Sequence, residues 1–230
     1  MALLNNDVRE ATKAEFDAKM EHPVKIVLFT QEPGRLIKLS PVQGQDCMFC
    51  KETRQLLEEV AGLSDKISLE ILDFKADKDR AAAFGVDKIP AIVLMGEEDY
   101  GIRMYGIPSG YEYSTLVEDI VDVSRRRTTL SDATKEALKA IDKDIRIQVF
   151  VTPTCPYCTM AVRLAHQFAN ESPRIRGEMV ESTEVPHLAN KHQVYGVPKT
   201  IVNETVSFEG AVPEEVFLEN VLKAAKPETP

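Results

Sequence analysis

Four cysteines form two Cys-x-x-Cys motifs, Cys47 with Cys50 and Cys155 with Cys158. When a helix begins at such a motif, the second thiol lies about one turn after the first, within reach of a disulfide. The reactive form of cysteine is the thiolate, which the unpaired N–H groups at a helix start stabilise. We therefore predict thiol–disulfide exchange, in which Cys47 and Cys155 attack and Cys50 and Cys158 resolve the mixed disulfide.

The residues beside the cysteines predict that the two centres are unequal. Pro156 suits the first turn of a helix, where its missing N–H costs no hydrogen bond. Asp46 directly precedes Cys47, and a carboxylate there opposes thiolate formation. We expect Cys155 to have the lower pKa and to do most of the attacking.

A repeated spacing ties each cysteine motif to a proline. Pro90 is the fortieth residue after Cys50, and Pro198 is the fortieth after Cys158. A trans proline could simply begin the apolar strand that follows. A cis proline would instead bring its loop against the cysteines, and its identical place in both halves favours this reading.

The order of expected elements is also repeated. Each half reads as helix, strand, cysteine motif with helix, strand, helix, proline, two strands and a closing helix. The expected strands are 24–30, 67–74 and 91–95, then 145–152, one near 178–180, and 200–203; the helices between and after them are 78–84, 114–124, 186–192 and 214–225. The fold class is thus α/β, with one unit at 1–127 and a second at 128–230, whose first helix Ser131 or Asp132 would cap.

Two features belong to the first unit alone. Its strand and cysteines are separated by an extra segment, Gln31–Asp46, whose Pro, Gly and Gln content predicts a loop. This loop would shield Cys47, dock a partner, or be a tolerated insertion. Met48 and Phe49 would form an apolar lip that contacts unfolded substrates, or Phe49 would pack under the helix.

Composition excludes several classes of protein. The 230 residues are 43% hydrophobic and 28% charged, with a net charge of −9, so nucleic acid is not an expected partner. No apolar run is long enough to cross a bilayer, and the N-terminal residues do not resemble a secretory signal. We expect a cytoplasmic protein, where paired cysteines are catalytic or metal-binding more often than structural.

Zinc binding and a structural disulfide are the alternatives for the cysteines. Paired motifs in zinc ribbons usually lie about 15–20 residues apart, far closer than Cys50 and Cys155. A disulfide across two intervening residues closes too small a ring to add much stability. His166, His187 and His192 have no ligand spacing and are interpreted as surface or packing residues, so no metal or bound cofactor is expected.

The chain resembles the thioredoxin and glutaredoxin superfamily. Residues 155–158, Cys-Pro-Tyr-Cys, are the glutaredoxin-type tetrapeptide, and 196–198, Gly-Val-Pro, resemble the loop that carries the cis proline. Two such units in tandem are similar to the protein disulfide oxidoreductases of thermophiles. The segments 100–103 and 106–110 also resemble the first unit of that family.

This resemblance implies an enzyme that reduces, oxidises and rearranges disulfides of protein substrates. It implies the redox-active disulfides Cys47–Cys50 and Cys155–Cys158, electrons from a thioredoxin-reductase-like flavoprotein, and cis prolines at 90 and 198. The backbones of Ile89 and Val197, beside Pro90 and Pro198, would bind an extended substrate. An alternative is a relay that carries electrons from a reductase to a single partner such as a peroxidase.

The sequence departs from thioredoxin itself in two ways. Thioredoxin has Trp before its first cysteine, and this chain has no Trp. Thioredoxin also has a buried Asp six residues before that cysteine, where the second unit has Val149. A proton relay through that position is therefore not expected.

Overall fold

The computed structural model describes residues 2–31 and 47–226. Within the first unit the elements are α1 (Asn6–Lys19), β1 (Val24–Thr30), α2 (Cys50–Ala61), β2 (Ile67–Asp73), α3 (Lys78–Ala83), β3 (Ala91–Met95), β4 (Asp99–Tyr105) and α4 (Glu112–Arg125). The second unit contains α5 (Asp132–Lys139), β5 (Ile145–Val151), α6 (Cys158–Glu171), β6 (Ile175–Glu181), α7 (Pro186–Lys191), β7 (Lys199–Val202), β8 (Val206–Glu209) and α8 (Glu214–Ala225).

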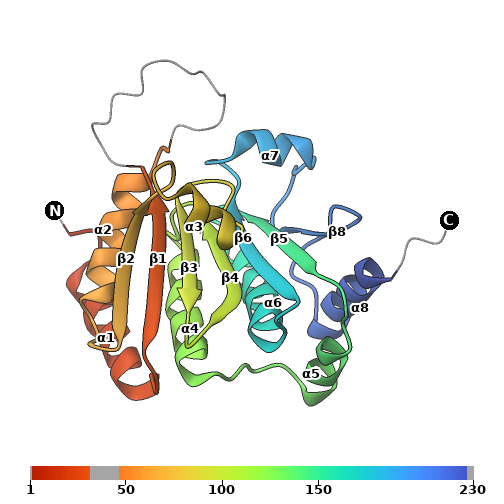
Figure 1. Cartoon of the computed structure of the whole chain (residues 1–230), viewed down its shortest axis with the longest axis horizontal. Coiled ribbons are helices and arrows are strands. Elements are labelled where there is room, and N and C mark those ends of the chain that lie inside the picture. The colour runs from red at the N-terminus through yellow and green to blue at the C-terminus, as the bar shows by residue number, and fades with distance from the viewer. Residues whose placement is uncertain (1, 32–46, 227–230) are drawn as a thin grey trace.

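The strands form one continuous eight-stranded sheet in the order β2-β1-β3-β4-β6-β5-β7-β8 (Figure 1). Each unit contributes four strands in the same relative order, with one parallel pair followed by two antiparallel pairs. This confirms the predicted α/β class, with two tandem thioredoxin-like folds that each have a mixed sheet flanked by helices. The division at residues 127 and 128 stays a prediction.

Local sequence predicted three elements with the observed bounds, and the other predicted ranges differ from the observed bounds by one to three residues at their ends. The periodic apolar residues predicted β1, β3 and α8 with the observed bounds. At α5, the side chain of Ser131 accepts a hydrogen bond from the N–H of Thr134 at 3.2 Å, so Ser131 is the cap. The predicted loop Gln31–Asp46 lies outside the described residues except for Gln31.

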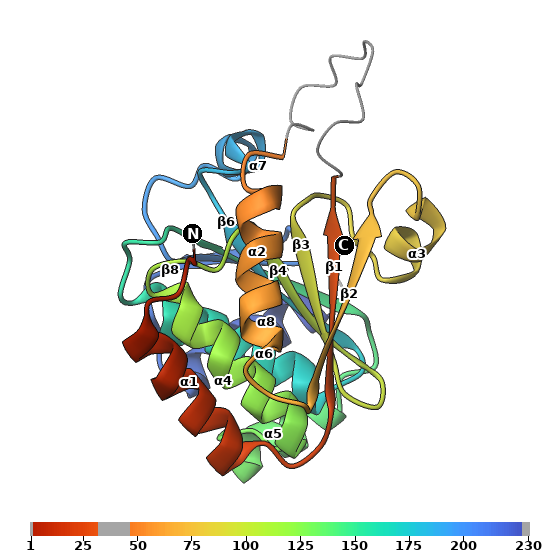
Figure 2. The same ribbon diagram turned by 90° about the vertical axis from the view of Figure 1, so that its left-hand side faces the viewer.

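The two faces of the sheet carry different helices (Figures 1 and 2). The larger apolar core joins alternate strand residues to α1, α2, α4, α5, α6 and α8. The smaller core lies on the opposite face, where α7 and α3 cover residues such as Val27, Phe29 and Phe150. Strand side chains alternate between the faces, so β1 and β5 are buried on both sides.

The units join where β4 pairs in parallel with β6, from Ile102 beside Gly177 to Tyr105 beside Val180. The pairing satisfies backbone N–H and C=O groups that would otherwise be unpaired along an exposed strand edge. Both CxxC helices therefore begin along the same edge of one sheet, the edge where β1 and β5 end.

Charged side chains reinforce this junction between helices α4 and α6. Arg163 of α6 pairs with Asp119 and with Asp122 of α4, the latter at 2.5 Å. The fully buried His166 contacts Asp119 through Nδ1 at 2.5 Å and the carbonyl oxygen of Arg103 through Nε2 at 3.1 Å. Because each buried polar group has a partner, the network holds the units in one arrangement.

Gly177 sets how closely α6 approaches the junction. A Cβ at this position would lie 2.3 Å from the carbonyl oxygen of Ala165 in α6, and backbone cannot give way as a side-chain tip can. We predict that Gly177→Ala lowers the free energy of unfolding by about 1–3 kcal/mol, because the helix must shift. Denaturant unfolding measures this. Gly62→Ala is the control, because a Cβ there meets only ordinary contacts at 3.5 Å; equal stability of the two variants would contradict the prediction.

Candidate active site

Both cysteine pairs lie at the starts of helices. Cys47–Cys50 and Cys155–Cys158 are disulfides, with α2 beginning at Cys50 and α6 at Cys158. In each pair the first cysteine is half-buried, while the second is only 5% or 0% exposed. The exposure suits the expected attacking and resolving roles, which stay predictions.

The structure corrects the expected place of Pro156. The helix begins at Cys158, so Pro156 lies two residues before it and not in its first turn. Two backbone hydrogen bonds hold the turn. The N–H of Cys155 donates to the carbonyl oxygen of Thr152 at 3.1 Å, and the N–H of Cys158 donates to the carbonyl oxygen of Cys155 at 3.3 Å. Cys155 therefore faces the start of α6, where a thiolate is stabilised. The predicted difference from Cys47 rests on Asp46, which lies outside the described residues.

Both proline peptide bonds are cis, and the loop of the second unit lies against its cysteine. Ile89–Pro90 and Val197–Pro198 are both cis peptide bonds. The sulfur of Cys155 lies 3.7 Å from the carbonyl oxygen of Val197. For the first unit, the described residues give no corresponding polar contact between Cys47 and Ile89. The carbonyls of Pro90 and Pro198 accept equivalent hydrogen bonds from Gly106 and Gly210, at 3.0 and 2.8 Å.

A buried carboxyl group lies at the start of α4, near the second centre. Glu112 is 1% exposed, and burial raises its pKa to about 7. The N–H of Tyr111, the residue before Glu112, donates to the carbonyl oxygen of Pro153 at 3.2 Å. Pro153 lies in the loop that leads to Cys155. Sequence reasoning missed Glu112, because an acidic residue in the first turn of a helix is common on exposed surfaces. Val149, by contrast, is fully buried and apolar as expected.

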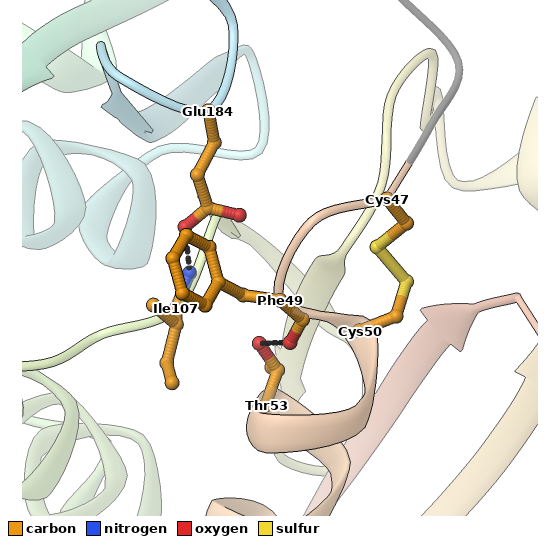
Figure 3. Close-up of a disulfide and its surroundings, with 6 residues drawn as sticks. All are labelled: Cys47, Phe49, Cys50, Thr53, Ile107 and Glu184. Carbon is orange, nitrogen blue, oxygen red and sulfur yellow. Dashed lines mark hydrogen bonds between the residues drawn. A yellow bond between two sulfur atoms is a disulfide. The ribbon is translucent and has the colours of Figure 1, made fainter.

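A half-buried carboxyl group of the second unit, that of Glu184, contacts the first unit. Glu184, in the turn between β6 and α7, accepts a hydrogen bond from the N–H of Ile107 at 2.7 Å. Figure 3 shows its carboxyl group beside Ile107 and turned toward Phe49, the residue before Cys50. Burial raises the pKa of Glu184 to about 7 as well. The sequence contained no sign of this contact between units.

A large pocket lies away from the cysteines. It has a volume of about 460 Å³ and is lined by residues near the starts of β4, β5 and β6, including Arg103, Arg146, Arg174 and Arg176. None of the predicted site residues lines it. Over residues 2–31 and 47–226, no group of three or more His, Cys, Asp or Glu side chains could hold a metal ion. The helices in the same ranges include none long and apolar enough to cross a membrane.

Comparison with known families gives a thioredoxin match over part of the second unit. Residues 145–223 match the model of a thioredoxin domain. Among solved structures, a protein disulfide oxidoreductase from Aeropyrum pernix is 32% identical, with a TM-score of 0.85. The alignment covers 96% of this chain and 93% of that one.

Other relatives are named as an alkyl hydroperoxide reductase subunit or as an NADH dehydrogenase. The NTD_N/C domain of alkylhydroperoxide reductase AhpF from Enterococcus faecalis shares the fold, with a TM-score of 0.83 at 24% identity over 95% of this chain and 99% of that one. The alkyl hydroperoxide reductase AhpF of Pseudomonas aeruginosa is 25% identical over 74% of this chain, and an NADH dehydrogenase from Bacillus subtilis is 26% identical over 66%. The matched regions span only 31% and 28% of those two proteins.

We predict that Glu112 makes stability depend on pH. Its pKa is 4.5 in ordinary surroundings and about 7 in the fold, so the folded chain binds the proton more tightly between these values. Stability should therefore fall as pH rises through this window. Glu112→Gln should be more stable than the unsubstituted chain by up to about 3 kcal/mol at pH 8, and much less so at pH 4.

Denaturant unfolding between pH 4 and 8 measures this difference. The control is Glu136→Gln, which removes an exposed carboxylate from α5. A stability difference between Glu112→Gln and the unsubstituted chain that does not change with pH would rule out an uncharged, buried Glu112.

Proposed function

Because the chain belongs to the protein disulfide oxidoreductase family, we propose that it reduces, oxidises and rearranges disulfides of protein substrates through both cysteine pairs. It is a thiol–disulfide oxidoreductase of the thioredoxin type, with two CxxC sites. The specific activity on protein disulfides is the part that we propose. Cys47, Cys50, Cys155 and Cys158 carry the reaction.

The observation that carries this proposal is the contact between Cys155 and the loop of Val197. The carbonyl oxygen of Val197 lies 3.7 Å from the cysteine sulfur. The pairing of β7 with β5 begins only at Lys199, so the sheet does not use the backbone of Val197. An extended polypeptide whose disulfide reaches Cys155 can therefore pair with that backbone. Ile89 holds the equivalent position before Pro90 in the first unit.

Exposed apolar side chains surround these positions. Met48 and Tyr157 lie inside the two motifs and are each 66% exposed. Met160, two residues after Cys158, is 57% exposed. Tyr195, two residues before Val197, is 90% exposed. Such side chains suit contact with unfolded polypeptides, whose own apolar residues are accessible.

The proposed reaction balances without any bound cofactor. The Cys155 thiolate attacks one sulfur of the substrate disulfide, and the other substrate sulfur leaves as a thiolate that takes up a proton. The Cys158 thiolate then attacks Cys155, forming the Cys155–Cys158 disulfide and releasing the second substrate thiol. Two electrons pass from the enzyme to the substrate, and the same steps at Cys47 and Cys50 serve the first centre.

Reduction of the resulting disulfides requires an electron donor. We propose a thioredoxin-reductase-like flavoprotein as this donor, which fits relatives named as an NADH dehydrogenase and as an alkyl hydroperoxide reductase subunit. Those relatives also favour the second candidate function, a relay that passes electrons from such a flavoprotein to a peroxidase. The cytoplasmic location stays a prediction.

Cysteine substitutions test the main proposal. We predict that Cys155→Ser lowers the rate of insulin disulfide reduction at least tenfold, because the second centre loses its nucleophile. Cys47→Ser should lower the rate far less, by about a tenth at most, because the two centres act in parallel. The turbidity of precipitating insulin chains reports the reduction, and refolding of a scrambled disulfide-rich protein reports rearrangement. A greater loss in Cys47→Ser would reverse the assignment of the dominant centre.

Assays of the unsubstituted protein distinguish the relay from an oxidoreductase that acts on many protein disulfides. Absence of insulin reduction and of refolding activity, together with rapid reduction of a peroxidase, would favour the relay. Alkylation of all four cysteines should abolish either activity. Full activity after alkylation would exclude both redox functions.

A further inference from the structure

The turn that carries Glu184 is held rigidly at the junction between the units. The carboxylate of Glu181, at the end of β6, accepts hydrogen bonds from the N–H groups of Thr183 and Glu184 at 3.2 and 2.8 Å, and from the Thr183 hydroxyl at 2.6 Å. These bonds fix the direction of Glu184. The same segment continues through α7 to Val197, so its start contacts Ile107 beside Phe49 of the first motif, and its end contacts Cys155 of the second.

The first unit leaves room for the Glu184 carboxyl group. A Cβ at Gly106, just after β4, would lie 2.8 Å from Oε1 of Glu184 and 2.5 Å from Cβ of Glu181. Gly106 also has a φ of 97°, which favours glycine. The next residue, Ile107, donates its N–H to Oε1, so one carboxyl oxygen is satisfied across the junction.

The second oxygen of this carboxyl group has different surroundings. Within the described residues, Oε2 of Glu184 is buried without a hydrogen bond. Phe49, which points toward the carboxyl group in Figure 3, offers only an apolar ring. A buried carboxylate oxygen without a donor disfavours the charged form. The pKa of about 7 follows mainly from this burial, while the Ile107 hydrogen bond acts in the opposite direction.

Within residues 2–31 and 47–226, few charges act on this group. Glu181 is the neighbouring charge that raises the pKa further, and the loop of Gly106 and Ile107 adds none. The packed α2 carries Lys51 and Glu52 directly after Cys50, and α7 carries His187 and Lys191. Reduction of the Cys47–Cys50 disulfide adds two titratable thiols to this set.

We propose that Glu184 of the second unit is a positioning residue for the first redox centre, whose charge controls how readily the reduced Cys47–Cys50 pair reacts. A thiolate at this pair and an ionised Glu184 repel each other through a region of low polarity. Ionised Glu184 thus disfavours the thiolate, whereas protonated Glu184 allows it to form more readily. The inference rests on the proposed redox function, because it assigns a role in that chemistry.

Glu184→Gln tests this role, since glutamine keeps the acceptor for Ile107 but cannot ionise. The full chain with Cys155→Ser and Cys158→Ser isolates the first pair, which is reduced and then alkylated with iodoacetamide between pH 5.5 and 8.5. Peptide masses report the rate at Cys47. We expect Glu184→Gln to react at the same rate as its parent at pH 5.5 and about three to ten times faster at pH 8.

The control is Glu209→Gln, which removes an exposed carboxylate from β8 at the far end of the sheet and should leave the profile unchanged. A rate ratio that is constant across this pH range would overturn the proposal, because a purely structural effect does not follow the ionisation of Glu184. Iodoacetamide needs no protein substrate, so this result is independent of whether insulin is reduced.

A second measurement covers the case in which the variant does not fold. In the oxidised, unsubstituted protein, the carboxyl carbon of Glu184 can be followed by ¹³C NMR during a pH titration. We expect a midpoint near pH 7. A midpoint near 4.5, the ordinary value, would overturn the proposal, because the carboxyl group would then stay ionised throughout the range in which the thiols titrate.

Discussion

The parallel pairing of β4 with β6 is the constraint on which the rest of this structure depends. It converts two four-stranded sheets into one sheet, so the ends of β1 and β5 lie along the same edge. The cysteine helices α2 and α6 therefore begin on one side of the molecule (Figure 1). Without this pairing, β4 and β6 would each be an exposed edge, and the two redox centres would have no fixed relation.

The junction also determines what surrounds each centre. Gly177 allows α6 to lie close to β6, and the buried contacts of Asp119 with Arg163 and His166 lock α6 to α4. The loop before Cys155 rests on the start of α4, a helix of the first unit, through the N–H of Tyr111. Glu184 of the second unit reaches the Ile107 loop beside Phe49 in return. A segment of the other unit thus lies near each cysteine motif.

Sequence reasoning predicted the features that depend on local pattern or on the repeat. Apolar periodicity located β1, β3 and α8, and the forty-residue spacing located both cis prolines. It could not predict that β4 and β6 pair, because an edge strand of one unit looks the same whether it faces solvent or another strand. For the same reason His166, Glu112 and Glu184 looked like ordinary polar residues. Their burial arises from contacts between segments far apart in the chain, and no local pattern records those contacts.

The central claim is that the two cysteine pairs are both redox-active centres of one molecule. Equilibration of the full chain in glutathione buffers of graded potential, followed by acid quenching, alkylation and intact-mass analysis, tests it directly. The account predicts that each pair passes reversibly from disulfide to dithiol, so that species with zero, two and four alkylated thiols appear in turn. A pair that remains a disulfide at every potential, or that stays reduced throughout, would contradict it.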